Sequence, residues 1–276
     1  MSACPKILIV AGGLSRRMGR DKSQIECRPG ITQMDYLIKL AKEFDSAPLV
    51  SSNDPSKVPD GIEVLPDLHP GAGPLASLEA FHARFPDEPV LLLGCDQFLL
   101  DAATIQQLID ERNSEKSATA FANRIDKRAE PLCAIYEAPA VAASLAAIEK
   151  ERFCARHFLE DQEPELLTLN HPIALDGANT PEELDEVMAK LEVGVEPKSI
   201  KVLYYAKLRE ERGESEETIE TLSCTAGGLY EELRFKNRFS LKIAGLRCAR
   251  NGEFCDWKTR LEAGDEIVFI PPVAGG

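Results

Sequence analysis

The sequence Val10-Ala-Gly-Gly-Leu-Ser-Arg-Arg-Met-Gly-Arg-Asp-Lys22 decides how the first part of this chain is expected to fold. It follows the apolar run Ile7 to Val10, which predicts a buried strand that opens into a loop. Glycines in such a loop let the backbone approach a ligand and turn its N–H groups toward it, and the basic side chains neutralise phosphate charge. The loop therefore favours a nucleoside triphosphate site over the alternative of a basic surface turn. Its spacing matches neither a P-loop nor a dinucleotide-binding motif.

Length and composition limit the class of protein. With 276 residues the chain is long enough for one large or two ordinary domains, and a hydrophobic content of 44% is sufficient for a core. No apolar run approaches the roughly 20 residues of a membrane span, and Pro5 and Lys6 lead into the first strand without a signal peptide, so we expect a cytoplasmic protein. Eight cysteines without a C-x-x-C pair favour reduced thiols over a disulfide framework or a zinc site.

The charge is unevenly distributed along the chain. A net charge of -14 argues against nucleic acid or an anionic membrane as a partner. From Lys198 onward 13 basic and 13 acidic residues balance, so the excess of acidic residues lies before that point. Against this acidic background the basic residues at 16, 17, 20 and 22 favour a local site for an anion.

Strand and helix patterns alternate up to about residue 192. Strands are expected at 7–10, 48–52, 62–65, 89–94, 118–123, 131–137 and 166–169, and helices at 34–44, 101–112, 139–150, 152–160 and from 181 onward. A turn at 70–77 is expected to open a further helix that runs to about residue 85. Thr180 is expected to cap the last of these helices, with Pro181 in its first turn. The alternation predicts an α/β fold with a Rossmann-like, mostly parallel sheet, whose ligand site lies beyond the carboxyl ends of the strands.

Three polar residues follow the ends of expected strands: Asn53, Asp67 and Asp96. Asp96 comes after a continuous apolar run, which is typical of a parallel strand buried on both faces. Because Mg²⁺ takes one or two carboxylates together with phosphate oxygens, Asp96 is the candidate metal ligand, and the alternative is a cap for the following helical turn. For Asn53 and Asp67 the alternative is turn formation.

The loop at 10–22 resembles in nearly every position the motif [LV]-A-G-G-x-S-x-R-M-G-x-D-K of sugar-nucleotide-type nucleotidyltransferases, and it is most similar to molybdenum cofactor guanylyltransferases. The resemblance covers residues 5–192, so the first domain is expected at 1–192. It implies GTP and Mo-molybdopterin as substrates and Mg²⁺ as cofactor. The nucleotide-binding residues that it implies are Val10, Ala11, Gly12, Gly13, Lys22, Asn53, Asp67 and Asp96. It further implies Lys22 and Arg17 as catalytic residues, Asp96 as metal ligand, and Asn179 as a contact to product or metal.

Two departures from the family pattern keep alternatives open. Gly177 stands where the family has the first Asn of an N-x-N-T-P stretch, and the segment from Ser23 to Gln33 is polar where the family usually is not. One alternative is therefore a catalytically weak first domain that serves as a docking partner. Another is a cytidylyltransferase that makes the cytosine form of the same cofactor.

The last part of the chain predicts a second, small domain. Residues 193–198 have the composition of a linker, and the domain is expected at 199–276. Strands at 199–206, 218–222, 241–249 and 266–270, with a helix at 225–236, predict a β-grasp, ubiquitin-like fold. The chain ends in Gly275 and Gly276, which have no side chains, so this end could enter a narrow tunnel that leads to the active site of another enzyme. The alternative is a frayed terminus.

This domain resembles the small sulfur-carrier subunit of molybdopterin synthase in its Gly264-Asp265-Glu266 turn, its Pro-Pro pair and its terminal Gly-Gly. The resemblance implies that the carboxylate of Gly276 is adenylated and then converted to a thiocarboxylate. The implied partners are the molybdopterin synthase large subunit and an adenylating, sulfur-transferring activating enzyme, and a molybdenum insertase and apo-molybdoenzymes are further candidates. Together the two halves indicate a fused protein of molybdenum cofactor biosynthesis.

Overall fold

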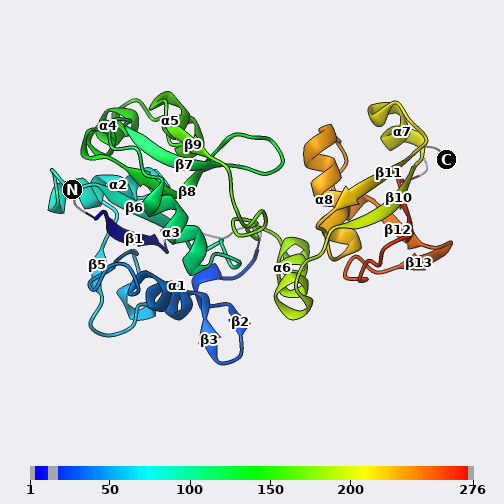
Figure 1. Cartoon of the computed structure of the whole chain (residues 1–276), viewed down its shortest axis with the longest axis horizontal. Coiled ribbons are helices and arrows are strands. Elements are labelled where there is room, and N and C mark those ends of the chain that lie inside the picture. The colour runs from blue at the N-terminus through cyan, green and yellow to red at the C-terminus, as the bar shows by residue number, and fades with distance from the viewer. Residues whose placement is uncertain (1–3, 12–17, 273–276) are drawn as a thin grey trace. The chain divides into compact units, whose positions relative to one another are not determined.

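A computed structural model describes residues 4–11 and 18–272 of the chain (Figure 1). It divides into two compact units, Met1–Asp176 and Gly177–Gly276. Among the described residues, no helix combines the length and the apolar character that crossing a lipid bilayer requires.

The first unit is built on a seven-stranded sheet in the order β5-β4-β1-β6-β8-β7-β9 (Figure 1). Its strands are β1 (Lys6–Val10), β4 (Leu49–Ser51), β5 (Glu63–Leu65), β6 (Val90–Gly94), β7 (Ala118–Ala122), β8 (Ala129–Tyr136) and β9 (Glu165–Leu167). Strand β8 runs antiparallel to its neighbours β6 and β7, and the other adjacent pairs are parallel. The predicted mostly parallel α/β fold is confirmed.

Helices cover both faces of this sheet. Ile7 and Ile9 of β1 pack in the same core as α1 (Gln33–Ala41) and α3 (Ala102–Asp110). Leu8 belongs to the core on the other face, with residues of α2 (Pro74–Arg84), α4 (Ala138–Glu149) and α5 (Ala155–Asp161). Because successive strand residues point to opposite faces, a strand covered on both sides must be apolar throughout, as this run is.

A short hairpin lies in the segment that departs from the family pattern. Strands β2 (Glu26–Arg28) and β3 (Ile31–Thr32) pair across a turn in which Gly30 has a φ of 67°. The Arg28 guanidinium lies 3.4 Å from the centre of the Tyr36 ring and donates a hydrogen bond to the Phe98 carbonyl. These contacts, together with the short 3₁₀ helices Lys22–Gln24 and Pro55–Lys57, were not predicted, since two- and three-residue elements leave no periodicity to detect.

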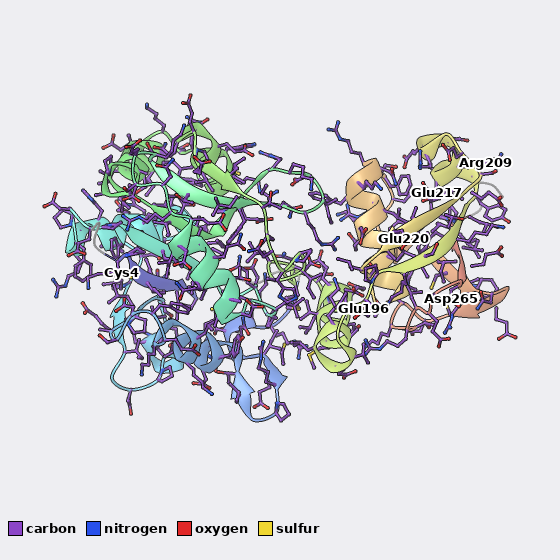
Figure 2. All side chains as sticks on the ribbon, in the orientation of Figure 1. Cys4, Glu196, Arg209, Glu217, Glu220 and Asp265 are labelled. Atoms are coloured by element: carbon purple, nitrogen blue, oxygen red, sulfur yellow. The ribbon has the colours of Figure 1, made fainter. Side chains whose placement is uncertain are left out.

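The second unit contains a five-stranded mixed sheet in the order β11-β10-β14-β12-β13. Its elements are β10 (Lys198–Tyr204), α7 (Ala206–Arg212), β11 (Glu216–Thr221), α8 (Ala226–Asn237), the 3₁₀ helix Ile243–Gly245, β12 (Arg247–Arg250), β13 (Glu253–Cys255) and β14 (Glu266–Ile270). The apolar residues of α8 pack with those of the strands in one core, which confirms the predicted β-grasp fold. Asp265, labelled in Figure 2, lies in the turn that precedes β14.

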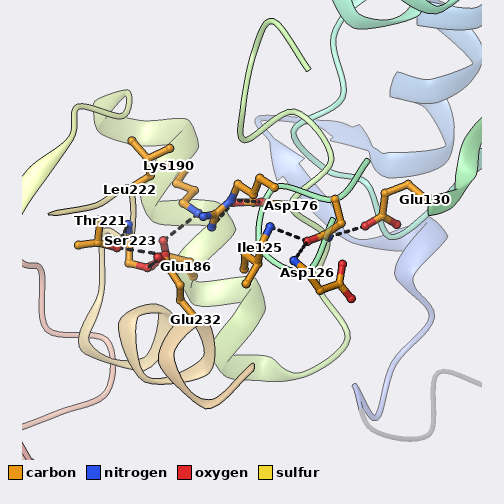
Figure 3. A network of polar contacts seen from close by, with 12 residues as sticks. Ile125, Asp126, Glu130, Asp176, Glu186, Lys190, Thr221, Leu222, Ser223 and Glu232 are labelled. Atoms are coloured by element: carbon orange, nitrogen blue, oxygen red, sulfur yellow. Dashed lines mark hydrogen bonds and ion pairs between the residues drawn. The ribbon is translucent and has the colours of Figure 1, made fainter. Parts of the chain in front are cut away.

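Helix α6 (Pro181–Val193) lies in the second compact unit, Gly177–Gly276. The Glu186 carboxylate accepts hydrogen bonds of 2.8 Å from the backbone N–H groups of Cys224 and Thr225 at the start of α8. Lys190 lies 3.1 Å from the same carboxylate (Figure 3). At Gly228 an added Cβ would lie 2.2 Å from a Glu186 oxygen, so only glycine permits this close approach. The carboxylate thus satisfies the backbone N–H groups of the two residues that lead into α8, and its negative charge lies at the positive N-terminal end of that helix.

Candidate nucleotide-binding site

The candidate site lies at one edge of the first sheet. Strands β5, β4, β1 and β6 are parallel neighbours, so their carboxyl ends lie at the same edge. Asp67, Asn53, Ala11 and Asp96 follow these four strands in that spatial order. Backbone hydrogen bonds from Ala11 N–H to the Ser51 carbonyl and from Cys95 N–H to the Val10 carbonyl continue the strand pairing up to this edge. The topology therefore brings together residues that lie far apart in the sequence.

Asn53 and Asp67 form a reciprocal pair. The side-chain amide of Asn53 donates to Asp67 at 2.7 Å, and the backbone N–H of Asp67 donates to the Asn53 side-chain oxygen at 3.0 Å. The Ser51 hydroxyl donates to the second carboxylate oxygen of Asp67 at 3.1 Å. These contacts fix the orientation of a carboxylate and an amide, the two groups that present acceptors and donors to a nucleobase edge.

Asp96 and Lys22 face one another across the end of β1 and β6. The Lys22 ammonium lies 3.9 Å from the Asp96 carboxylate, and the side chains are 15% and 25% exposed, respectively. A Cβ added at Gly94 would lie 2.6 Å from Asp96 Oδ1, so the glycine makes room for this carboxylate. A partly exposed carboxylate beside a cation at this separation has acceptor capacity left for a further ligand.

The residues present suit Mg²⁺ bound jointly with phosphates. Within residues 4–11 and 18–272, no three His, Cys, Asp or Glu side chains gather closely enough to hold a metal ion by themselves. Mg²⁺ is usually held by one or two carboxylates together with substrate phosphates and water, which matches a single Asp96 carboxylate. The donor chemistry of Asp96 fits such an ion.

Asp21 anchors the far end of the loop. Its carboxylate pairs with Lys57 at 2.8 Å and accepts hydrogen bonds from the backbone and hydroxyl of Ser23. Burial alone would raise the pKa of Asp21, but the hydrogen bonds from Lys57 and Ser23 outweigh it and lower the pKa. The pair ties the loop to the connection between β4 and β5, and nothing in the sequence signals it because the two residues are 36 positions apart.

A second polar cluster lies around the turn between β7 and β8. Arg124 pairs with Asp176 at 2.8 Å, and Glu130 pairs with Arg156 at 3.3 Å. Burial raises the pKa of Glu130, and the carboxylate of Asp96 adds to the effect, whereas Asn123 and Arg156 oppose it. The negative charge of Asp96 therefore acts on Glu130 in this cluster. The sequence did not predict the cluster.

The remaining predicted residues are placed as follows. Val10 is a buried residue of β1, and Asn179 belongs to the second unit, where its backbone N–H donates to Glu183 at 2.6 Å. Gly12, Gly13, Arg17, Gly275 and Gly276 lie outside the described residues. Their roles stay predictions.

Comparison with known proteins identifies the family. The profile described as MobA-like NTP transferase domain matches residues 7–166, more than half of the 276 residues. The chain belongs to this family. Residues 202–276 match the ThiS family, so the chain joins a MobA-like NTP transferase domain to a ThiS family domain. Both resemblances seen in the sequence are thereby confirmed.

Individual relatives agree with the profile. The chain is 25% identical over 130 residues to a probable molybdenum cofactor guanylyltransferase of Clostridium perfringens, which covers 47% of this chain and 64% of that protein. It is 26% identical over 190 residues to a probable molybdenum cofactor guanylyltransferase of Nostoc, covering 67% of this chain and 91% of the relative.

A solved structure shares the fold of the first unit. The molybdopterin-guanine dinucleotide biosynthesis protein A of Archaeoglobus fulgidus superposes with a TM-score of 0.54 at 19% identity, covering 65% of this chain and 94% of that one.

Proposed function

We propose that the MobA-like unit transfers GMP from GTP to Mo-molybdopterin and releases pyrophosphate. The observation that carries the proposal is the arrangement of Lys22 and Asp96 at 3.9 Å, at the same carboxyl edge of four parallel strands that also carries the Asn53–Asp67 pair. The guanylyltransferase relatives supply the reaction class. In this reaction the phosphate of the pterin attacks the α-phosphorus of GTP, and no protein nucleophile is required.

The residues at this edge act by positioning and by neutralising charge. Lys22 neutralises the phosphates of GTP, which lowers the repulsion that the attacking phosphate meets. Asp96 would hold Mg²⁺ together with the phosphate oxygens, and the ion would supply further neutralisation of the charge that develops in the transition state. Gly94 keeps the Asp96 carboxylate at the strand end by leaving space for it.

The choice of base rests on Asn53 and Asp67. A carboxylate accepts from the N–H groups of guanine, and an amide both donates and accepts. A base that presents a different set of donors and acceptors leaves the remaining hydrogen-bonding capacity of these two groups unpaired. GTP is therefore expected to bind more tightly than CTP or ATP. Titration calorimetry measures the three affinities, and equal affinities would contradict guanine selection and return CTP to consideration.

Product analysis tests the reaction directly. The full chain is incubated with Mo-molybdopterin, Mg²⁺ and one of GTP, CTP or ATP, and the pterin product is identified by its mass. The guanine dinucleotide form is expected with GTP and only traces with the others. The cytosine form would favour the cytidylyltransferase alternative. If no nucleotide is transferred although GTP binds, the first unit is a docking partner.

We further propose that the ThiS family domain carries sulfur as a thiocarboxylate on Gly276. Support comes from the family match and from β14, which runs to Ile270 and leads into Pro271 and the C-terminal residues. The proposed partners are an activating enzyme that adenylates the carboxylate and the molybdopterin synthase large subunit that accepts the sulfur. A cytoplasmic location is proposed with them.

A further inference from the structure

Two cysteines of the second unit lie directly opposite each other on adjacent strands. Cys248 of β12 and Cys255 of β13 are register partners in an antiparallel pair. Their sulfur atoms are 3.4 Å apart, and the Cys248 thiol also lies 3.1 Å from the Cys255 carbonyl oxygen. Among the described residues, the other six cysteines have no sulfur–sulfur contact of this kind in the structure.

The backbone geometry suits a disulfide at this position. Residues directly opposite in an antiparallel pair have Cα atoms about 4.5 or 5.5 Å apart, and both separations lie within the range that disulfides span. The sulfur atoms need to approach by about 1.4 Å to reach bonding distance, which side-chain rotation supplies without moving the strands. The two thiols therefore need no rearrangement of the fold to be joined.

The two thiols differ in exposure. Cys248 is 2% exposed, whereas Cys255 lies on the edge strand and is partly exposed. Burial raises the pKa of the Cys248 thiol, and the hydrogen bond with Cys255 raises it further. A buried thiol with a raised pKa reacts slowly with a reagent in solution, so a reagent meets Cys255 first.

We propose that Cys248 and Cys255 form a redox-active dithiol that a low-molecular-mass disulfide converts to a cross-strand disulfide. The Cys255 thiolate attacks one sulfur of the reagent and releases one thiolate, which leaves a mixed disulfide on Cys255. Cys248 then loses its proton, attacks the Cys255 sulfur and displaces the second thiolate. The two cysteines lose two electrons and two protons, and the reagent disulfide is reduced to two thiols.

The position of the pair relates it to the C-terminal segment. Cys248 is also the register partner of Phe269 in β14, two residues before Pro271. The rings of Trp257 and Phe269 are stacked in the same core, with their centres 6.2 Å apart. The disulfide would tie the edge strand β13 to β12 at the level where the chain leaves the sheet, which gives the carrier domain an oxidised and a reduced form. This inference does not depend on GMP transfer by the first unit.

Peptide mapping tests the proposal on the full chain. The protein is treated with glutathione disulfide, the remaining thiols are alkylated, and trypsin cleaves after Arg247, Arg250 and Lys258. The two cysteines then lie in separate peptides, 248–250 and 251–258. The expected result is a linked pair of these peptides that contains most of the Cys248 and that separates after treatment with dithiothreitol.

Single substitutions distinguish the two steps. In Cys248→Ser, Cys255 should keep a stable mixed disulfide with glutathione, because no thiol is left to displace it. In Cys255→Ser, Cys248 should remain a free thiol because it is buried. The matched control is Cys224→Ser, which changes another buried cysteine of the same unit and should give the linked peptides at the wild-type yield. The proposal is overturned if wild-type protein keeps glutathione on Cys255 without linked peptides, or if neither cysteine reacts while the exposed Cys4 and Cys154 do.

Discussion

Asp96 in the first unit and Glu186 in the second show two ways in which this chain holds a carboxylate. Glu186 is 9% exposed and accepts hydrogen bonds from Cys224 and Thr225 while it pairs with Lys190. Asp96 is 25% exposed and faces Lys22 at 3.9 Å. Glu186 satisfies its acceptor capacity within the fold, whereas Asp96 retains room for a ligand.

The comparison separates structural from chemical roles in both units. A buried carboxylate whose partners are all supplied by the chain contributes to stability, and removing it leaves its partners uncompensated. A partly exposed carboxylate beside a loop that we propose to bind phosphates should instead contribute to activity, and removing it should leave the fold intact. Substitutions at the two positions should therefore change different measured quantities.

The largest effect is expected at Gly276, where we propose that the second unit carries sulfur on its terminal carboxylate. Deleting Gly276 should abolish sulfur loading, because an added or missing residue displaces the reactive carbon by roughly 3.5 Å and a displacement of about 1 Å already costs on the order of 100-fold. Loading is measured as the intact mass of the protein after reaction with activating enzyme, ATP and a sulfur donor. Replacement of one oxygen of the C-terminal carboxylate by sulfur adds about 16 Da.

The control for this deletion is GMP transfer by the same protein, which should keep its wild-type rate. A mass gain that persists in a chain lacking both Gly275 and Gly276 would place the sulfur elsewhere, and a cysteine would be the first residue to examine.

Asp96→Ala should lower GMP transfer by about 100-fold or more, since removal of one preorganised charged group at a phosphoryl centre has an effect of this order. The unfolding transition of the first unit should be unchanged, because the Asp96 carboxylate is partly exposed and its contact with Lys22 is 3.9 Å long. Asp87→Ala, at an exposed turn, is the matched control and should transfer at the wild-type rate. Wild-type turnover by Asp96→Ala would refute the metal assignment.

Glu186→Ala should destabilise the second unit by about 3 kcal/mol, because it leaves Lys190 buried without this partner and the backbone N–H groups of Cys224 and Thr225 unsatisfied. Trp257 is the single tryptophan of the chain, so its fluorescence during urea unfolding reports on this unit. Glu192→Ala is the matched control on the same helix: Glu192 pairs with Arg260 at the surface, and its loss should cost less than about 1 kcal/mol. Equal costs for the two substitutions would show that Glu186 does not anchor α6.

The same contrast explains what the sequence predicts and what it does not. Asp67, Asn53 and Asp96 could be assigned to one site because each follows an apolar run, and the ends of parallel strands coincide by geometry alone. Asp21–Lys57 and Glu130–Arg156 could not be predicted, because the two partners of each pair are far apart in the chain. A single charged residue in a sequence is most simply interpreted as exposed to solvent.

Helix α6 shows the limit most clearly. Glu186 and Lys190 are four residues apart, which in a sequence is typical of an exposed helical ion pair. The pair is buried because α6 packs against α8, and Gly228 on α8 provides the space. Such an arrangement depends on two segments meeting in space, and neither segment carries a periodic signal for it.

The smallest effect is expected at Asp265. This residue tests whether a carboxylate that is fully hydrogen-bonded within the fold stops stabilising the folded state when it is protonated. Its carboxylate accepts from Glu262 N–H and Asn251, and it pairs with Arg250 at 2.7 Å. Burial alone would raise the pKa of Asp265, but these hydrogen bonds outweigh it and hold the pKa below the ordinary value of 3.8. The ionised form therefore stabilises the folded state above that pH, and the contribution is lost as the pH falls through the lowered pKa.

Asp265→Asn should accordingly cost about 2 kcal/mol at neutral pH, as expected for hydrogen bonds to a charged group, and the cost should shrink as the pH is lowered below 3.8. Urea unfolding followed by Trp257 fluorescence at several pH values measures this difference. Glu253→Gln, at an exposed position of β13, is the control and should show a small cost that does not change with pH. If the cost of Asp265→Asn is also independent of pH, the shape of the side chain rather than its charge holds the turn before β14, and the comparison of carboxylates would not extend to this residue.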